Sequence, residues 1–226
     1  MSKFAMLLAA TSALGVVATA GAAQAQDEDP GFQAGSILIR ARAVGVFPDV
    51  TSSVTPIGGN IAIGRDYIPE IDASYFFTPN VAVEAIAGTT RNKVEARQAA
   101  GGSVWDNLGN VWLLPPTVTA QWHFQPQGVV NPYLGAGLNY TFFYNAQNGS
   151  QNTGIKYDDH IGYAVQAGAD IHLSGAWYAN VDYKKIFLKT TATVNALGAS
   201  APPGIATTAK VNIDPELVGV GIGYRF

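Results

Sequence analysis

The amino-acid sequence predicts an all-β protein, an eight-stranded antiparallel up-and-down transmembrane β-barrel. Three observations predict this fold. Apolar residues alternate with polar or small residues in eight segments, and the connections between these segments alternate in length. Only 13% of the residues are charged, although 48% are hydrophobic. Since charged residues make up about a quarter of a soluble domain, this chain is not expected to expose its whole outer surface to water.

The chain begins with a predicted cleaved signal peptide, residues 1–25, and residues 26–226 are predicted to form the barrel. Lys3 precedes an uncharged, mostly apolar stretch from Phe4 to Val17, and Ala23-Gln24-Ala25 fits the small-x-small cleavage rule. The stretch is short and rich in small residues, which favours a signal peptide over a membrane anchor. Export and the absence of cysteine fit the periplasm or outer membrane of a Gram-negative bacterium.

A long segment without charge lies in the middle of the chain. Residues 107–155, 49 in all, include no Asp, Glu, Lys or Arg. Pro115, Pro116, Pro126 and Pro132 interrupt this segment, so it cannot form one membrane-spanning helix. A closed β-barrel is the other structure that pairs every backbone N–H and C=O group in a bilayer.

Apolar alternation with a period of two marks eight segments of about ten residues, long enough to cross a membrane when tilted. In the last one, Val218, Val220 and Ile222 share one face with two aromatic residues, and glycines occupy the other face. The eight predicted strands are Ser36–Val46, Ile68–Phe77, Val81–Gly88, Leu114–Phe124, Pro132–Tyr144, Ile161–Leu173, Trp177–Leu188 and Val218–Phe226.

The connections between these strands alternate between long and short. Residues 78–80, 125–131 and 174–176 form short connections. The long ones are polar or rich in Gly and Pro, and comprise residues 47–67, 89–113, 145–160 and 189–213. Short periplasmic turns and long extracellular loops are typical of an outer-membrane barrel. With the first strand running outward, both termini of the mature chain are expected in the periplasm.

The charged residues of the strands share the face opposite the apolar row. A soluble lipocalin-like barrel would instead place its apolar residues inside, so we expect polar residues in the lumen and apolar residues against lipid. Aromatic residues gather at the strand ends, which is typical of interfacial girdles. They are Phe77, Trp122, Phe124, Trp177, Tyr224 and Phe226 near the short turns, and Tyr140, Phe142 and Tyr163 toward the long loops.

Four segments resemble the OmpW family of eight-stranded outer-membrane barrels. These are Leu114–Phe124 (LPPTVTAQWHF), Asn131–Phe143 (NPYLGAGLNYTFF), Ile213–Pro215 (IDP) and Gly223–Phe226 (GYRF). The resemblance spans essentially the whole mature chain. It implies a narrow barrel linked to the passage of small hydrophobic molecules, with alkane-uptake proteins among the relatives, and it does not identify the ligand.

The predicted inward residues differ between the two halves of the lumen. The half near the long loops is mixed to apolar and contains Val44, Val46, Thr117, Asn139, Thr141, Phe143, Ala164, Ile186, Leu188 and Leu217. The other half is an ionic floor formed by Arg40, Arg42, Asp72, Glu84, Asp170, Asp182, Lys184 and Arg225. Because an eight-stranded barrel is just wide enough for side chains, a large aqueous pore is not expected. An apolar pocket above an ionic floor suits a small hydrophobic ligand, and packing for stability alone is the alternative.

Two features at strand ends suggest further roles. Pro115 and Pro116 remove two ladder donors, which indicates either the start of a strand or a lateral opening toward the membrane. Tyr224 and Phe226 resemble the C-terminal signal that the outer-membrane assembly machinery recognises. Outer-membrane lipid and small hydrophobic molecules are the other expected partners.

Other classes of function have less support in the sequence. Asp170, His172 and Ser174 lie two residues apart as in a triad, but no nucleophile elbow accompanies them, so a lipid-modifying enzyme is not expected. Residues 158–160 (DDH) form an isolated acidic loop, and we expect no metal and no cofactor. The net charge of −3 gives no reason to expect nucleic-acid binding. A structural or surface-receptor barrel without transport remains an alternative.

Overall fold

The computed structural model describes residues 31–55, 60–88, 90–97, 105–148, 152–196 and 206–226. The regular structure of these residues consists of fifteen β-strands. No helix in the described ranges is both long and apolar enough to cross a membrane. The predicted signal peptide, residues 1–25, lies outside the described residues.

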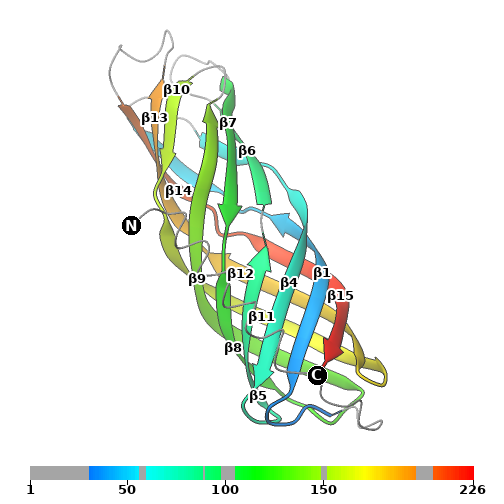
Figure 1. Ribbon diagram of the computed structural model, residues 1–226. Helices are drawn as coiled ribbons and strands as arrows, with labels where there is room; N and C mark the ends of the chain where they lie inside the picture. The colour runs from blue at the N-terminus through cyan, green and yellow to red at the C-terminus, as the bar shows by residue number, and fades with distance from the viewer. Residues whose placement is uncertain (1–30, 56–59, 89, 98–104, 149–151, 197–205) are drawn as a thin grey trace.

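Eight strands close into an antiparallel barrel, which confirms the predicted fold class (Figure 1). Each strand pairs with its neighbour along the chain, and the ring closes where β15 pairs with β1. The barrel strands are β1 (Ile37–Phe47), β4 (Asp66–Phe76), β5 (Val81–Gly88), β8 (Thr117–His123), β9 (Val130–Asn148), β11 (His160–Ser174), β12 (Trp177–Phe187) and β15 (Glu216–Arg225). All eight overlap the predicted strands.

The short connections and the C-terminus lie at the same end of the barrel, which we call the turn end (Figure 1). Here Ile37 and Phe226 close the barrel by exchanging two backbone hydrogen bonds. The Phe226 N–H donates to the Ile37 carbonyl at 2.8 Å, and the Ile37 N–H donates to the Phe226 carbonyl at 3.1 Å. These bonds pair the ends of β1 and β15, so no open edge remains at the closure.

Seven further strands extend the wall at the opposite end, which we call the extension end (Figure 1). They are β2 (Thr51–Thr55), β3 (Asn60–Ile63), β6 (Thr90–Arg97), β7 (Trp105–Leu114), β10 (Asn152–Tyr157), β13 (Lys189–Ala196) and β14 (Ala206–Asn212). β7, β6 and β3 continue the sheet from β9, and β10, β13, β14 and β2 form a separate four-stranded sheet.

The expectation of long loops is therefore wrong for much of residues 47–67, 89–113, 145–160 and 189–213. Segments such as β13 (KTTATVNA) and β14 (ATTAKVN) are rich in Thr and Val, which favour strands. They lack the apolar alternation on which the sequence argument relied. The inward residues of these two strands are Thr190, Ala192 and Val211, all buried. Thr and Ala differ little in hydropathy from their outward neighbours, so the alternation is too weak to stand out in the sequence.

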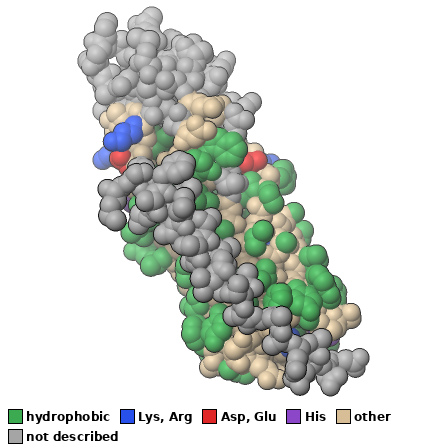
Figure 2. Space-filling model, in the orientation of Figure 1, with side chains coloured by type: hydrophobic (Ala, Val, Ile, Leu, Met, Phe, Trp, Pro, Cys, Tyr) green, Lys and Arg blue, Asp and Glu red, His purple; other side chains and the backbone are tan. Residues whose placement is uncertain are grey.

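The outer surface of the barrel carries the large apolar side chains (Figure 2). Exposed examples are Leu138, Val220 and Ile222, whereas Arg40 and Glu84 are fully buried in the interior. The predicted orientation, polar inside and apolar outside, is therefore correct, and the soluble-barrel alternative is wrong. The predicted girdle residues Phe77, Trp122, Phe124, Trp177, Tyr140, Tyr163 and Phe226 are among the exposed aromatic side chains.

Glycines on the inner face of β15 make room for arginine side chains of β1. A Cβ atom at Gly221 would lie 2.2 Å from the Ala41 carbonyl oxygen and 2.7 Å from Arg42 Cγ. At Gly223 a Cβ atom would lie 3.1 Å from Arg40 Cγ. The alternation in β15 therefore has two causes. The apolar residues face lipid, and the glycines leave space for the two arginine side chains that lie against the inner wall.

Candidate functional site

The lumen is filled by three successive layers of side chains, and β12 shows their order. From the turn end, its inward residues are Tyr178, then Asn180, Asp182 and Lys184, then Ile186. We call the layers the lower plug (Phe32, Leu38, Phe76, Ala82 and Tyr178), the ionic floor (Arg40, Arg42, Glu70, Asp72, Glu84, Asp170, Asp182 and Lys184) and the upper apolar cluster. Period-two alternation on every strand sets these layers, because every second residue faces the lumen.

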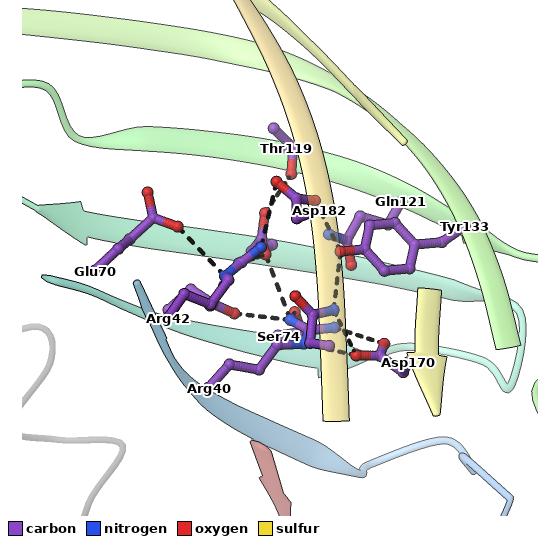
Figure 3. A network of polar contacts seen from close by, with 12 residues as sticks. Arg40, Arg42, Glu70, Ser74, Thr119, Gln121, Tyr133, Asp170 and Asp182 are labelled. Atoms are coloured by element: carbon purple, nitrogen blue, oxygen red, sulfur yellow. Dashed lines mark hydrogen bonds and ion pairs between the residues drawn. The ribbon is translucent and has the colours of Figure 1, made fainter. Parts of the chain in front are cut away.

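Arg40 lies at the centre of the ionic floor and binds carboxylates from three strands (Figure 3). Its Nε and Nη2 donate to the two oxygens of Asp170 at 2.9 and 2.8 Å. Its Nη1 donates to Asp72 at 2.7 Å and to the Ser74 hydroxyl at 2.8 Å, and lies 3.4 Å from Glu84. A bidentate guanidinium–carboxylate pair fixes orientation as well as charge, so Arg40 ties β1 to β4 and β11.

Arg42 follows Arg40 on the inner face of β1, nearer the extension end, and contacts four carboxylates. Its Nε donates to Asp72 at 2.8 Å and lies 3.3 Å from Glu70, and its Nη2 bonds Glu84. Its Nη1 lies 3.3 Å from Asp182. The four carboxylates come from β4, β5 and β12, so this one cation joins several sides of the barrel wall.

Neutral polar side chains complete the floor (Figure 3). Glu84 accepts hydrogen bonds from Gln166 Nε2 at 2.9 Å and from the Thr119 hydroxyl at 3.2 Å. The Tyr133 hydroxyl donates to Asp182 at 2.8 Å, and Asn180 donates to Asp170 at 2.8 Å. Buried charges are stable when such partners replace water, and the floor is a dense network in which Arg42 Nη1, Gln166 Oε1 and Asn180 Oδ1 are the atoms left without a hydrogen-bond partner among the described residues.

Lys184 marks the top of the ionic floor and is held more loosely than the arginines. Its Nζ lies 3.6 Å from Asp182 and 4.0 Å from Glu70. With Lys184 the floor has three positive and five negative side chains, a formal charge of −2. The next inward residue of β12 is Ile186, where the apolar layer begins.

The upper apolar cluster fills the lumen between the floor and the extension. Seven of the residues predicted to line the upper lumen belong to it, namely Val44, Val46, Phe143, Ala164, Ile186, Leu188 and Leu217. The cluster also contains Ile68, Val111, Leu113, Ala192, Val211 and Ile213. Tyr157 of β10 packs against it with its ring 5.4 Å from that of Phe143, and burial raises the pKa of the Tyr157 hydroxyl.

The other three predicted upper-lumen residues form a polar strip beside Pro115 and Pro116. Asn139 Nδ2 donates to the Thr117 hydroxyl at 2.8 Å and to the Pro115 carbonyl at 3.2 Å. The Thr141 hydroxyl donates to Asn139 Oδ1 at 2.7 Å. These three residues are buried and bond one another at the junction between β7 and β8.

The lower plug closes the turn end of the barrel below the ionic floor. Phe32, which precedes β1, is fully buried, with its ring 4.4 Å from Phe76 and 4.9 Å from Tyr178. The Phe32 N–H donates to the Pro126 carbonyl at 2.9 Å. The segment before the first strand therefore folds into the barrel end, and its apolar side chain completes an aromatic layer.

Several lumen residues were not predicted from the sequence. Glu70 and Ile68 share the parity of Asp72 in a predicted strand, so that signal was present and unused. Phe32 lies outside every predicted strand, and nothing in the alternation points to it. Arg225, predicted for the ionic floor, lies one layer lower, opposite Leu38, and its Nη1 donates to the Gly31 carbonyl.

The residues considered for catalysis and metal binding have other contacts. Arg40 and Asn180 bond the carboxylate of Asp170, and His172 Nε2 bonds the Gly175 carbonyl at 2.9 Å. Among the described residues, no group of three or more His, Asp or Glu side chains could hold a metal ion.

A closed antiparallel barrel with an apolar outer wall, short turns at one end and a filled polar interior defines an outer-membrane β-barrel protein. Within that class, residues 33–226 match the OmpW family, and the chain belongs to it. The resemblance seen in the sequence is thereby confirmed, and the protein lies in the outer membrane of a Gram-negative bacterium.

Relatives and solved structures agree with this assignment. The chain is 41% identical over 191 residues to the uncharacterized outer-membrane protein y4mB of Sinorhizobium fredii, covering 83% of this chain and 79% of that protein. It is 32% identical over 202 residues to outer membrane protein W of Vibrio cholerae, covering 86% and 90%. The crystal structure of OprG from Pseudomonas aeruginosa is similar with a TM-score of 0.79 and 25% identity, covering 88% of this chain and 99% of OprG.

Proposed function

We propose that this barrel provides a narrow path for small hydrophobic molecules, which enter the upper lumen from outside and leave sideways into the membrane near Pro115 and Pro116. The observation that carries the proposal is the stacking of an apolar layer of thirteen buried residues directly on a filled ionic floor. The family resemblance, with its alkane-uptake relatives, points to the same class of ligand.

The floor argues against straight passage to the periplasm. A solute moving along the axis would have to displace Arg40 and Arg42 from carboxylates that they contact at 2.5–3.4 Å. Breaking buried ion pairs costs about 3–5 kcal/mol each when one partner loses its counter-charge. An apolar solute offers nothing in return, so a ligand that reaches the upper apolar cluster has to leave through the wall or return outside.

A break in the wall beside the prolines supports a lateral exit. The β5–β8 pairing ends with Ile86 opposite Thr117, and the β6–β7 pairing resumes with Thr90 opposite Leu113. The register is the same on both sides of the break. Continuing this register, Pro116 faces Ala87 and Pro115 faces Gly88 across a seam in which the two prolines lack an N–H group. We call this break the seam.

A third proline lies near the seam on its other side. Pro69 of β4 comes one residue before Glu70, the last β4 residue that pairs with β5. A Cβ atom at Gly88 would contact Ile68 at 3.7 Å and the Pro69 carbonyl at 3.9 Å. Gly88 therefore lies beside the upper apolar cluster and at the seam, where a path from one to the other would pass.

A reversible cross-link tests this exit. The chain has no cysteine, so Ala87→Cys with Pro116→Cys introduces a single pair across the seam. The matched control is Ala85→Cys with Val118→Cys, which spans the same two strands where they are already paired and has both side chains on the outer face. Proteoliposomes carrying each oxidised or reduced variant would be given a labelled alkane, a labelled steroid and a sugar of similar size.

The proposal expects transfer of the alkane or steroid, no transfer of the sugar, and a loss of transfer when the seam pair alone is oxidised. Reduction should restore it. Transfer that oxidation of the seam pair leaves unchanged would contradict the lateral exit. Transfer of the sugar alone would favour a porin.

A surface-receptor role is the second candidate, because seven strands extend the barrel beyond the membrane-spanning part. Such a structured platform suits recognition by a phage, a toxin or a host. Absence of transfer for all three solutes would favour this role or a purely structural one.

Assembly of the barrel involves its last strand in this proposal. Phe226 packs its ring 4.8 Å from Tyr224 at the end of β15 and pairs with Ile37 of β1. A terminal aromatic on the closing strand suits recognition by the outer-membrane assembly machinery, and outer-membrane lipid surrounds the finished wall.

A further inference from the structure

At the seam, a backbone carbonyl of the wall lacks a backbone partner among the described residues, and side chains of the lumen donate to it instead. In the β5–β8 ladder, the His123 N–H donates to the Asn80 carbonyl at 2.8 Å, and the Asn80 side chain donates to the His123 carbonyl at 2.7 Å, so this pair is a bonded position. Bonded and non-bonded pairs alternate along an antiparallel ladder. Continuing the register makes Gly88 and Pro115 a bonded position and Ala87 and Pro116 a non-bonded one. The Pro115 carbonyl therefore belongs to the ladder with β5, beyond the last paired residues.

Two lumen side chains donate to that carbonyl in place of a backbone N–H. Asn139 Nδ2 lies 3.2 Å from the Pro115 oxygen, and the Thr117 hydroxyl lies 3.1 Å from it. Asn139 is fully buried, and the Thr141 hydroxyl donates to its Oδ1 at 2.7 Å. This second bond fixes the amide so that its nitrogen points toward the prolines.

The other side of the strand stays attached. The Tyr140 N–H of β9 donates to the Pro116 carbonyl at 3.0 Å, and pairing with β9 continues above it, with Leu114 opposite Phe142. The wall is thus loosened on the β5 side only, and Asn139 stands on the strand that remains attached.

We infer that Asn139, assisted by Thr117, is the positioning residue of the seam: its amide satisfies the Pro115 carbonyl from the lumen and so keeps the wall unpaired there. In hydrocarbon an unsatisfied backbone group costs several kcal/mol, which normally forbids a break in a barrel wall. An internal donor removes that cost for the Pro115 carbonyl. This inference concerns the geometry of the seam, and its consequence for transport rests on the proposed function.

The inference predicts how the seam responds when the donor is removed. In Asn139→Leu, which has a similar volume and no donor, the Pro115 carbonyl is left to the facing N–H of Gly88, and the two strands should close up. The rate at which the Ala87→Cys and Pro116→Cys pair oxidises reports this closure without reference to any ligand. The Pro116→Cys change adds an N–H on the β9 side, because position 116 is non-bonded toward β5, so it does not fill the seam itself.

The oxidation rate of the seam pair should rise roughly three- to tenfold in Asn139→Leu, the range that one hydrogen bond of ordinary net strength supports. Thr117→Val should produce a smaller rise, and Thr117→Ser, which keeps the hydroxyl, should restore the original rate. The Ala85→Cys and Val118→Cys pair should oxidise at the same rate in every background. If Asn139→Leu assembles poorly, the comparison of Thr117→Val with Thr117→Ser still tests the inference.

Unchanged oxidation of the seam pair in both Asn139→Leu and Thr117→Val would overturn the inference. A rise at both the seam pair and the control pair would also overturn it, since it would indicate general loosening of the barrel. A rise at the seam alone, together with slower transfer of the alkane, supports both the inference and the lateral exit. A rise at the seam alone with unchanged transfer supports the inference and contradicts the lateral exit.

Discussion

Replacing Arg42 with leucine should destabilise the barrel more than replacing any one carboxylate that it contacts. Arg42 contacts Glu70, Asp72, Glu84 and Asp182, all from within a network that excludes solvent. Its loss changes the formal charge of the ionic floor from −2 to −3 and leaves carboxylates facing one another. Removing a carboxylate instead moves the charge toward neutrality.

The two cases differ in expected magnitude. Breaking a buried pair by removing one partner costs about 3–5 kcal/mol, and Arg42→Leu should fall at the upper end because four carboxylates lose a partner at once. Glu84→Gln keeps an acceptor for the Thr119 hydroxyl, and Arg42 keeps three other carboxylates. We therefore expect about 1–3 kcal/mol for that variant, the range for one altered buried hydrogen bond.

The assay is the free energy of unfolding by urea in lipid vesicles, followed by tryptophan fluorescence and by the heat-dependent shift in gel mobility. Arg42→Leu should be less stable than Glu84→Gln by about 2 kcal/mol or more. Equal losses in the two variants would refute the reasoning, because they would mean that the floor is solvated and that its charge balance does not matter.

Three further predictions concern the plug, the closure and the C-terminus. Phe32→Ala should cost about 3–5 kcal/mol of stability, the range for truncating a buried aromatic side chain. Ion conductance should stay low, because the ionic floor still closes the lumen. A conductive variant would mean that the lower plug, and not the floor, seals the barrel. Gly221→Ala should weaken the β1–β15 closure by about 1–3 kcal/mol, whereas Gly219→Ala, whose Cβ atom would meet nothing closer than 3.3 Å, should be tolerated; similar losses would refute the steric argument. Deleting Phe226 should reduce outer-membrane assembly in cells more than refolding of the purified chain, and equal losses in both would assign the residue a packing role only.

The sequence predicts the membrane-spanning part of this protein well because a lipid-facing wall imposes a strict alternation. Val218, Val220 and Ile222 had to be apolar, and the small or polar residues between them had to face the lumen. The same parity places Arg40, Arg42, Asp72 and Glu84 inside, where the structure joins them. The depth of a residue in the membrane follows from its position along the strand, so the order of the ionic and apolar layers could also be predicted.

The remaining features depend on contacts that no periodic pattern records. Strands β13 and β14 bury Thr190, Ala192 and Val211, and this mixture of small, hydroxylated and apolar residues alternates too weakly to be recognised as a strand. Phe32 reaches its place through one backbone bond to the turn after β8. Asn139 is one inward polar residue among several in the sequence, and its meaning comes from the orientation of the Pro115 carbonyl. These contacts join residues distant in the chain, which single-strand periodicity cannot describe.

The two filled layers below the upper apolar cluster bear on the permeability barrier of the envelope. A general pore admits nutrients by connecting two aqueous compartments, so every added copy increases the leak of electrolytes. In this barrel Arg40 and Tyr178 belong to successive layers that have almost no solvent exposure. We therefore expect added copies of this barrel to contribute little to such a leak of electrolytes.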